Sequence, residues 1–260
     1  MVWGKLAMAG TRGIQSIEVG GRLLSSLVAN ATPMMLRDLA LATGLAPAQV
    51  HAYLTSYRRI GLVEQDERNG LYRLGPFAMR LGLGRLRCMP LVNQASRILG
   101  RLADEYNLMS LLVVWGPQGP TVVQVVEESS LSLNIRRGTV FELTSTASGH
   151  IFTALSNPGQ VAQMAEDELN GITKKAQRRL ARGTFEAAIE AVRRRGYAVI
   201  KNTPIPGVSA ISAPVFSPAR ELVAAITLVG PSSRLSVDED SAVIRRLLDD
   251  IHALNQGDPA

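Results

Sequence analysis

The residues with the clearest chemical potential lie on one face of a predicted helix near the N-terminus. The stretch from Pro47 to Ile60 predicts a helix, because proline suits the first helical position and Val50 and Leu54 recur at helical spacing. The opposite face is expected to meet solvent and carries Ala48, Gln49, His51, Ala52, Thr55, Ser56, Arg58 and Arg59. Glutamine can pair with an adenine edge and arginine binds phosphate, so this face has the chemistry needed to bind double-stranded DNA. An ordinary solvated helix face is the alternative interpretation.

A hairpin is predicted directly after this helix. Two short alternating runs flank Asn69-Gly70, and Asn-Gly between such runs is a strong hairpin signal. The residues able to reach a DNA backbone or minor groove are Arg68, Asn69 and Arg73. Phosphate would repel the acidic residues of the same hairpin, which are Glu64, Asp66 and Glu67. A plain surface hairpin therefore remains an alternative to a DNA-binding wing, and the tip is the part expected to contact DNA.

Catalytic motifs are missing from the sequence. There is no G-x-S-x-G, Walker loop, H-E-x-x-H or dinucleotide fingerprint, and the glycine-rich stretch Gly82–Arg87 ends in arginine and follows no predicted strand. Ser148 and His150 are two residues apart, so on a helix their side chains point about 200° apart and cannot share a proton relay. Catalysis and a cofactor are therefore not expected.

Cysteine and histidine content indicates neither disulfides nor a metal site. The chain has one cysteine, Cys88, and three histidines, which leaves little material for a Cys/His cluster. The longest charge-free apolar run, Tyr106–Val126, is interrupted by Gly116–Pro120, so no membrane segment is predicted. The first residues contain no apolar block typical of a signal peptide. These features favour a reducing, cytoplasmic location.

Charge is distributed unevenly along the 260 residues. Residues 1–90 contain 11 basic and 5 acidic side chains, whereas residues 91–260 contain 17 of each. The whole net charge of +6 therefore lies in the first third of the chain. A basic module joined to a neutral one suggests that the first module meets a polyanion and the second has another role.

The elements around the predicted DNA-binding face indicate a winged helix-turn-helix in residues 1–75. A helix is predicted over Gln15–Ala29, and Thr32-Pro33 predicts the start of a second helix over Met34–Thr43. Gly44 ends that helix before Pro47 opens the next. A connecting helix is predicted in residues 76–89, and its apolar side chains make it a candidate contact between copies of the chain; these are Phe77, Met79, Leu81, Leu83 and Leu86.

Residues 90–260 are predicted to form an α+β domain, because strand patterns are flanked by helices at both ends. The predicted helices are Leu91–Tyr106, Ala147–Leu155, Pro158–Leu169, Thr184–Arg195 and a last helix ending near Leu254. A capping box at Ser236–Glu239 is expected to open that last helix. The predicted strands are Met109–Trp115, Thr121–Val126, Ser130–Ile135, Val208–Phe216 and Leu222–Val229.

A collinear series of motifs resembles the IclR-type transcriptional regulators and covers the chain from about Ile14 to its end. The motifs are Gly44-Leu45, Gly61-Leu62-Val63-Glu64, Leu71-Tyr72-Arg73-Leu74-Gly75, Arg195-Gly196-Tyr197-Ala198-Val199, Pro206-Gly207-Val208, Ile211-Ser212-Ala213-Pro214-Val215-Phe216 and Val229-Gly230-Pro231. The resemblance implies a bacterial regulator with an N-terminal winged helix-turn-helix and a C-terminal GAF-like α/β effector domain. It also implies a homodimer or homotetramer that binds operator DNA under the control of a small-molecule effector.

The DNA-reading helix departs from the pattern that is common in the family. That pattern is Ser-Thr-Val, then an aromatic residue or histidine, then arginine. This chain instead has Ala48-Gln49-Val50-His51-Ala52. Because the usual serine and arginine are missing, the family's operator sequence does not carry over to this chain.

The resemblance also implies an effector pocket. Its polar end aligns with the helix start Ala147, Ser148 and Gly149, where backbone amides and the helix dipole favour a carboxylate. Its walls align with Leu133, Ile135, Phe141, Ile200, Ala210, Thr227 and Val229. Positions that are often polar in the family are apolar here, and these walls offer no charged side chain. We therefore expect a compact effector with an apolar or aromatic body and one polar end, although the same residues could simply pack a sheet.

These observations predict a ligand-responsive regulator of a catabolic operon that has no catalytic activity. One alternative is an architectural DNA-binding protein whose C-terminal domain only forms oligomers. A second alternative is an enzyme with a GAF-like body. An effect of a small molecule on operator affinity, or turnover by the purified protein, would separate the three classes.

Overall fold

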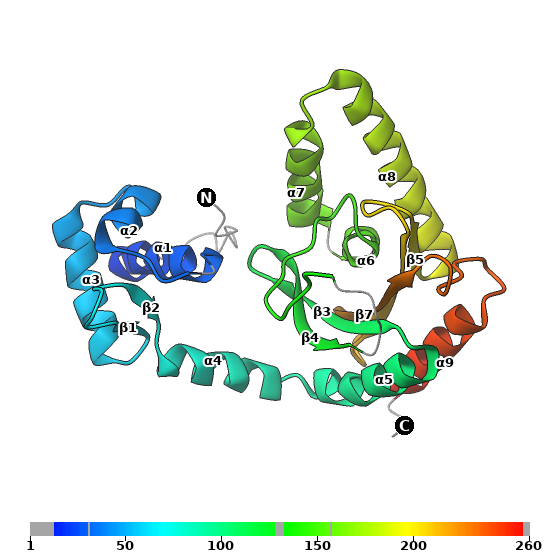
Figure 1. Ribbon diagram of the computed structural model, residues 1–260, viewed down its shortest axis with the longest axis horizontal. Coiled ribbons are helices and arrows are strands. Elements are labelled where there is room, and N and C mark those ends of the chain that lie inside the picture. The colour runs from blue at the N-terminus through cyan, green and yellow to red at the C-terminus, as the bar shows by residue number, and fades with distance from the viewer. Residues whose placement is uncertain (1–12, 31, 128–132, 157, 257–260) are drawn as a thin grey trace. The chain divides into compact units, whose positions relative to one another are not determined.

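A computed structural model of the chain describes residues 13–30, 32–127, 133–156 and 158–256. The chain divides into two compact units with the boundary between Met89 and Pro90, and each unit is described by itself (Figure 1). The first unit is predominantly helical and ends in a small hairpin and a further helix. The second unit is built around an antiparallel sheet.

The N-terminal unit is a winged helix-turn-helix. Its elements are α1 (Gln15–Ala29), α2 (Leu36–Thr43), α3 (Pro47–Arg59), β1 (Val63–Gln65), β2 (Tyr72–Leu74) and α4 (Pro76–Arg87). A small core joins the first three helices to the hairpin, and its buried side chains are Leu23, Leu27, Leu39, Ala40, Val50, Leu54, Val63 and Tyr72. The strands β1 and β2 pair antiparallel with Glu64 opposite Arg73.

Glycine makes the close packing of this unit possible at two positions. Gly44 follows α2 with φ of 68°, a left-handed conformation that lets the chain turn sharply toward α3. Gly20 lies on the buried side of α1, where a Cβ atom would be only 2.0 Å from the hydroxyl oxygen of Tyr57. A glycine here therefore lets α1 approach α3 closely enough to form the core.

The predicted start of α2 is wrong. Thr32 does not cap the helix, which begins at Leu36. The backbone amide of Met34 instead donates to the carbonyl of Tyr72 at 2.9 Å, and the amide of Tyr72 donates to the carbonyl of Met34 at 2.8 Å. This pairing adds a short third strand segment to the wing, which a local capping signal cannot reveal.

The C-terminal unit has a five-stranded sheet with the order β4-β3-β7-β6-β5, in which every neighbouring pair is antiparallel. The strands are β3 (Met109–Gly116), β4 (Gly119–Val126), β5 (Ala198–Lys201), β6 (Val208–Phe216) and β7 (Leu222–Pro231). The helices are α5 (Pro90–Tyr106), α6 (Ala147–Leu155), α7 (Pro158–Gly171), α8 (Lys175–Arg195) and α9 (Ala242–Gln256). The α+β class predicted for the chain is therefore confirmed.

The sheet separates two helical layers. α5 and α9 contact each other and pack on one face through β3, β6 and β7, while α6 packs on the other face against β5, β6 and β7 (Figure 1). α7 and α8 lie beyond α6 on that second face. Because side chains alternate along a strand, the odd-numbered residues Thr227 and Val229 of β7 face the α6 layer together with Ala210 of β6. This layer contains the cavity described below.

Three sequence predictions in this unit need correction. Residues 133–136 are not a strand, and the rest of the predicted strand Ser130–Ile135 lies outside the described residues. α8 begins at Lys175, so Thr184 is inside the helix and its hydroxyl donates to the carbonyl of Leu180 at 3.1 Å. The strand β5 follows Gly196 and was not predicted.

The last helix also begins later than predicted. The hydroxyl of Ser236 donates to the carboxylate of Asp238 at 2.9 Å, and it accepts a hydrogen bond from the amide of Asp238 at 3.3 Å. These bonds close a local turn, and α9 begins only at Ala242. The motif therefore organises the approach to the helix and does not cap it.

Candidate DNA-binding face and ligand cavity

The predicted DNA-reading side of α3 is turned away from the core. Val50 and Leu54 are fully buried, and this fixes the rotation of the helix about its axis. The side chains of Ala48, Gln49, His51, Ala52, Arg58 and Arg59 are exposed. Thr55 is half-buried, and its hydroxyl donates to the carbonyl of His51 at 2.8 Å. The exposed side thus presents an amide, an imidazole and two guanidinium groups.

The two arginines at the end of α3 are in different environments. The Nη1 atom of Arg58 donates to the Oε1 atom of Gln65 at 3.0 Å, which ties the end of the helix to the wing. Arg59 makes no hydrogen bond or ion pair with another residue in the described part of the chain. Arg59 is therefore available to an external anion, whereas Arg58 would have to exchange its partner.

Most polar side chains of the wing form hydrogen bonds or ion pairs with other residues of the wing. Asp66 accepts hydrogen bonds from the amide of Arg68 at 2.9 Å and from the side-chain amide of Asn69 at 3.1 Å. The Oδ1 atom of Asn69 accepts from the amide of Leu71 at 3.0 Å. Arg73 forms an exposed ion pair with Glu64 on the opposite strand. Of the three wing residues singled out in the sequence, Arg68 is the one whose side chain has no partner among the described residues.

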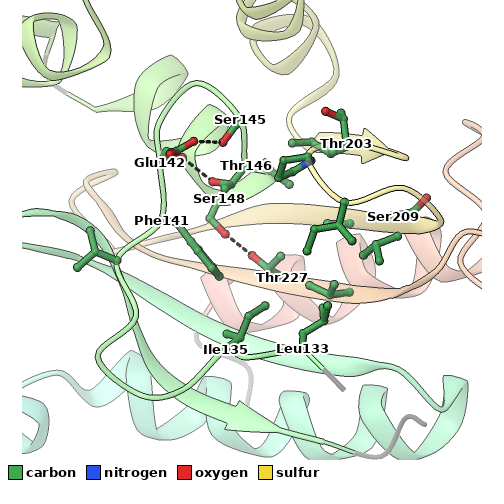
Figure 2. Close-up of a pocket in the computed structure, with 18 residues that line it drawn as sticks. Leu133, Ile135, Phe141, Glu142, Ser145, Thr146, Ser148, Thr203, Ser209 and Thr227 are labelled. Atoms are coloured by element: carbon green, nitrogen blue, oxygen red, sulfur yellow. Dashed lines mark hydrogen bonds between the residues drawn. The ribbon is translucent and has the colours of Figure 1, made fainter. Parts of the chain in front are cut away.

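A cavity of about 360 Å³ lies in the α6 layer of the second unit. It is enclosed by the loop before α6, by the first turn of α6 and by the strands β5, β6 and β7 (Figure 2). Nine of the ten residues singled out as an effector pocket line it, and these are Leu133, Ile135, Phe141, Ala147, Ser148, Ile200, Ala210, Thr227 and Val229. Three strands, a helix and a loop that are far apart in the sequence bring these residues together.

Gly149, the tenth residue, does not line the cavity. A Cβ atom at this position would be 2.2 Å from the carbonyl oxygen of Glu142 and 2.6 Å from the Cα atom of Leu143. The glycine therefore lets the loop before α6 lie directly against the first turn of the helix. Its contribution to the site is the position of this loop.

The polar corner of the cavity is a chain of three hydroxyl groups. Thr227 bonds to Ser148 at 2.8 Å (Figure 2). It also bonds to Ser212 at 2.8 Å, so two hydrogen bonds connect three hydroxyls. Ser212 is fully buried and has no other side-chain partner among the described residues, so its proton is used within the chain. The remaining proton belongs to Ser148 or Thr227. Because both line the cavity, one hydroxyl donor is available to a ligand.

The first turn of α6 adds further donors to this corner. Thr146 caps the helix by accepting from the amide of Gly149 at 3.0 Å. The amides of Ala147 and Ser148 make no hydrogen bond to another described residue, as expected for the first positions of a helix. The corner therefore favours a ligand group that accepts hydrogen bonds, and the helix dipole favours a negative charge there.

The structure adds residues to the cavity that the sequence analysis missed. These are Val140, Glu142, Ser145, Thr146, Thr203, Pro204, Ile205, Val208 and Ser209. The carboxylate of Glu142 accepts from the hydroxyl of Ser145 at 2.5 Å and adds a charged group to a lining whose predicted wall residues are all uncharged. Glu142 is exposed, which places its charge at the mouth of the cavity. Its position next to Phe141 in the sequence was the available signal.

The loop before α6 is held in place from two sides. Glu168 of α7 accepts from the amides of Leu143 and Thr144 and from the hydroxyl of Thr144, each at 2.9 Å. On the α6 side, the Nε2 atom of His150 lies 3.1 Å from the carbonyl oxygen of Thr144. The cavity wall formed by this loop is thus anchored by a carboxylate and an imidazole that do not line the cavity.

Burial disfavours the charged form of His150. Burial lowers its pKa below 6.5, and the charge of Arg195 lowers it further, while the hydrogen bond to Thr144 acts in the opposite direction. Its Nδ1 atom is buried without a partner among the described residues. The hydroxyl of Ser148 bonds to Thr227, so Ser148 and His150 have separate partners.

Neither a membrane-spanning helix nor a metal cluster occurs in the described structure. No helix among the described residues is both long enough and apolar enough to cross a bilayer. The same residues contain no group of three or more His, Cys, Asp or Glu side chains arranged to hold a metal ion.

A winged helix-turn-helix is a DNA-binding unit, and a cavity of this size can hold a small metabolite. A chain that combines the two has the architecture of a transcriptional regulator. Two family models match the chain in this order. The IclR helix-turn-helix domain matches residues 16–67, and the bacterial transcriptional regulator IclR C-terminal domain matches residues 84–254. The chain therefore belongs to the IclR family of DNA-binding transcriptional regulators.

Individual relatives agree with this assignment. The chain is 30% identical to the glycerol operon regulatory protein of Streptomyces griseus over 230 residues, which is 87% of this chain and 89% of the relative. The crystal structure of HmgR from Pseudomonas aeruginosa is 32% identical, with a TM-score of 0.57, and the match covers 94% of this chain and 98% of HmgR. An IclR homologue from Microbacterium hydrocarbonoxydans in complex with 4-hydroxybenzoate shares the fold, with a TM-score of 0.72, 16% identity and coverage of 94% and 98%.

Proposed function

We propose that this chain binds operator DNA as a homodimer or homotetramer and that a small organic acid with an apolar or aromatic body alters this binding. The observation that carries the proposal is the cavity in the α6 layer, which combines apolar walls with a single donor-rich corner at Ser148 and Thr227. Its volume of about 360 Å³ lies at the lower end of the range for small-molecule sites. The proposed target is the control region of a catabolic operon.

The shape of the hydrogen-bonding corner supports a carboxylate at one end of the ligand. The corner offers the amides of Ala147 and Ser148 and one hydroxyl proton. Away from this corner most of the wall is formed by aliphatic side chains and Phe141, together with the polar residues Thr203 and Ser209 and, at the mouth, the carboxylate of Glu142. A ligand rich in hydroxyl groups would leave several of them unpaired against these walls, at about 1–3 kcal/mol for each group. An aromatic ring would instead displace water from the apolar surface, which is favourable.

The names of two relatives give two different kinds of metabolite. The Microbacterium homologue binds 4-hydroxybenzoate, an aromatic acid, and the Streptomyces relative regulates a glycerol operon. The two compounds that these names mention differ in polarity, since one is aromatic and the other is a small polyol. The apolar lining of the present cavity favours the aromatic class.

The DNA side of the proposal rests on the exposed face of α3 and on Arg68 of the wing. A single winged helix reads one half-site, so a twofold assembly is required to read a repeated operator. The proposed contact lies on α4, where Met79, Leu81 and Leu83 are each at least half exposed. We expect a second copy to cover them. A protein acting on the chromosome in this way works in the cytoplasm and needs no catalytic step or cofactor.

A ligand screen by thermal shift tests the proposed effector class. Benzoate, 4-hydroxybenzoate and phenylacetate are expected to raise the melting temperature, because a ligand that binds the folded state stabilises it by mass action. Glyoxylate and sugar acids serve as small polar acids and are expected to have little effect. The same ligands are then added to a binding assay with DNA from upstream of the chain's own gene. Stabilisation by polar acids alone would contradict the apolar-cavity proposal.

A further inference from the structure

One side chain connects the end of α3 to the turn of the wing. Gln65 ends β1 and lies two residues after the buried Val63, so both side chains point to the same face of the hairpin, the face that meets the core and α3. The half-buried amide of Gln65 is used at both ends. Its Oε1 atom accepts from Nη1 of Arg58 at 3.0 Å, and its Nε2 atom donates to the carbonyl of Gly70 at 3.1 Å. We call these two hydrogen bonds the α3–wing bridge.

The base of the wing is held by other contacts, which do not reach its turn. Tyr72 of β2 is buried in the core and exchanges two backbone hydrogen bonds with Met34. The turn at residues 66–70 lies beyond these contacts, and its internal hydrogen bonds close it without fixing its direction. Within the described structure, the bond between Arg58 and Gln65 is the one side-chain hydrogen bond between α3 and the wing. The bridge is therefore the contact best placed to set the angle of the turn relative to α3.

This angle matters because the turn carries charges of both signs. Arg68 is exposed, and its side chain has no partner among the described residues. Asp66 and Glu67 directly precede it in the sequence. A DNA phosphate attracts the guanidinium and is repelled by the two carboxylates. A small rotation of the turn would thus exchange an attractive contact for a repulsive one.

We propose that Gln65 is a positioning residue for DNA binding, which holds the wing so that Arg68 meets a phosphate while α3 lies in the major groove. Arg58 acts through the same bridge, whereas the adjacent Arg59 has no partner among the described residues and is free to bind a phosphate directly. The proposal rests on the proposed function, because it assumes that α3 and the wing contact one operator half-site together. It assigns a role to a residue outside the predicted DNA-binding set.

A double-mutant cycle in operator binding by the full-length chain tests the α3 end of the bridge. Gln65→Ala is expected to raise the operator Kd about two- to tenfold, because it removes the connection between α3 and the wing. In the Arg58→Ala background it is expected to have no further effect, since the connection is already broken. Arg59→Ala is the matched control. In that background, Gln65→Ala is expected to keep its full effect.

A second cycle tests the wing end of the bridge. Arg68→Ala is expected to weaken binding by the wild-type chain and to reduce the salt dependence by about one phosphate contact. Both effects are expected to be smaller in the Gln65→Ala background, although Gln65 does not touch DNA in this account. Gln49→Ala on α3 is the control, and it is expected to cost the same in both backgrounds. A role of Gln65 in stability alone would leave both pairs additive.

A variant of matched size separates the bridge from the packing of the hairpin. Gln65→Met keeps the length of the side chain without its hydrogen bonds, so it is expected to bind DNA like Gln65→Ala while its urea unfolding midpoint stays close to wild type. The proposal is overturned if operator affinity is unchanged in Gln65→Met and Gln65→Ala. It is also overturned if Gln65→Ala keeps its full effect in the Arg58→Ala background or if Arg68→Ala costs the same with and without Gln65. A wild-type chain that binds no operator would instead overturn the proposed function, and this inference with it.

Discussion

At the scale of single residues, the two candidate sites use their polar groups differently. The exposed face of α3 leaves the side chains of Gln49, His51 and Arg59 without partners in the described chain, which suits a surface that meets a large polar ligand. In the cavity, by contrast, the hydroxyls of Ser148 and Thr227 are already connected to each other, and only one hydroxyl donor remains beside the amides of Ala147 and Ser148. A small ligand with one acceptor group matches this limited supply.

Substitutions on α3 should separate base recognition from phosphate binding. Gln49→Ala is expected to change the preferred base at one operator position and to weaken specific binding by about 1–3 kcal/mol, because the amide can pair with an adenine edge. Arg59→Ala is expected to weaken specific and nonspecific DNA binding alike and to reduce the salt dependence of binding. Fluorescence anisotropy with operator variants at several salt concentrations measures both effects. An unchanged base preference in Gln49→Ala would show that this residue does not read the sequence.

Ala210 offers a direct way to fill the cavity. Ala210 lines the cavity beside Val229, and the two residues are paired across β6 and β7. Ala210→Leu is expected to occupy part of the space and to weaken effector binding about tenfold or more, because overpacking a filled site costs about 1–3 kcal/mol. Operator affinity without effector is expected to remain within about twofold of wild type, since the substitution is in the other unit. Calorimetry with the best ligand from the thermal-shift screen tests this. An unaltered affinity would indicate that the ligand binds elsewhere.

His150 should make stability depend on pH. Its pKa in the folded protein is lowered by burial, so below the unfolded-state pKa of about 6.5 the unfolded chain takes up a proton that the folded chain refuses. The free energy of unfolding should therefore fall as the pH drops below about 6.5, by up to about 1.4 kcal/mol per pH unit, until the folded-state pKa is reached. His150→Gln retains a donor for the carbonyl of Thr144 without a titrating ring, and it should show a smaller dependence in urea unfolding between pH 7 and pH 5. The same pH dependence in both proteins would contradict this role.

At the scale of elements, much of the fold followed from local patterns. The bounds of α1 and the exposed side of α3 were predicted correctly, because Val50 and Leu54 fix which side of the helix is buried. The start of α2 was not, because Met34 pairs with Tyr72, which is distant in the sequence. α8 was predicted to begin at Thr184 because a hydroxyl there resembles a cap, whereas the helix begins at Lys175 without a side-chain cap.

The candidate cavity also has features that follow from the sequence and features that depend on contacts between residues far apart in the chain. The resemblance supplied nine of its lining positions, of which four lie on the strands β5, β6 and β7. Glu142 was missed because the loop before α6 has no periodicity that reveals which side chains point inward. The anchoring role of Glu168 was invisible for a similar reason, since it depends on how α7 lies against that loop.

The helix α4 should carry a contact between copies. No residue of this helix is buried within the chain, and Met79 is 65% exposed. Leu83→Glu places a charge in the middle of the apolar surface and is expected to shift the assembly to a smaller species and to weaken operator binding, because one half-site is then bound at a time. Light scattering at micromolar concentration measures the size. A variant that keeps the wild-type size and affinity would show that α4 is not a contact.

At the scale of the whole molecule, the two units divide recognition between them. The first 90 residues hold the entire excess of positive charge and the exposed face of α3, whereas the second unit is neutral and contains the cavity. In the proposed function, the polyanion therefore binds the first unit and the small organic acid binds the second. A regulator built in this way requires that occupation of the cavity change the affinity of the DNA-binding unit.

The central claim is tested most directly by measuring operator affinity with and without an effector. The full-length chain is titrated onto duplex DNA from upstream of its own gene at fixed salt, first alone and then with a saturating aromatic acid identified by thermal shift. We expect the dissociation constant to change by about 5- to 150-fold, the range typical of coupled sites. We also expect Ala210→Leu to suppress this change while the affinity without effector is preserved. Tight operator binding that no cavity-binding acid alters would contradict the account and would instead indicate an architectural DNA-binding protein.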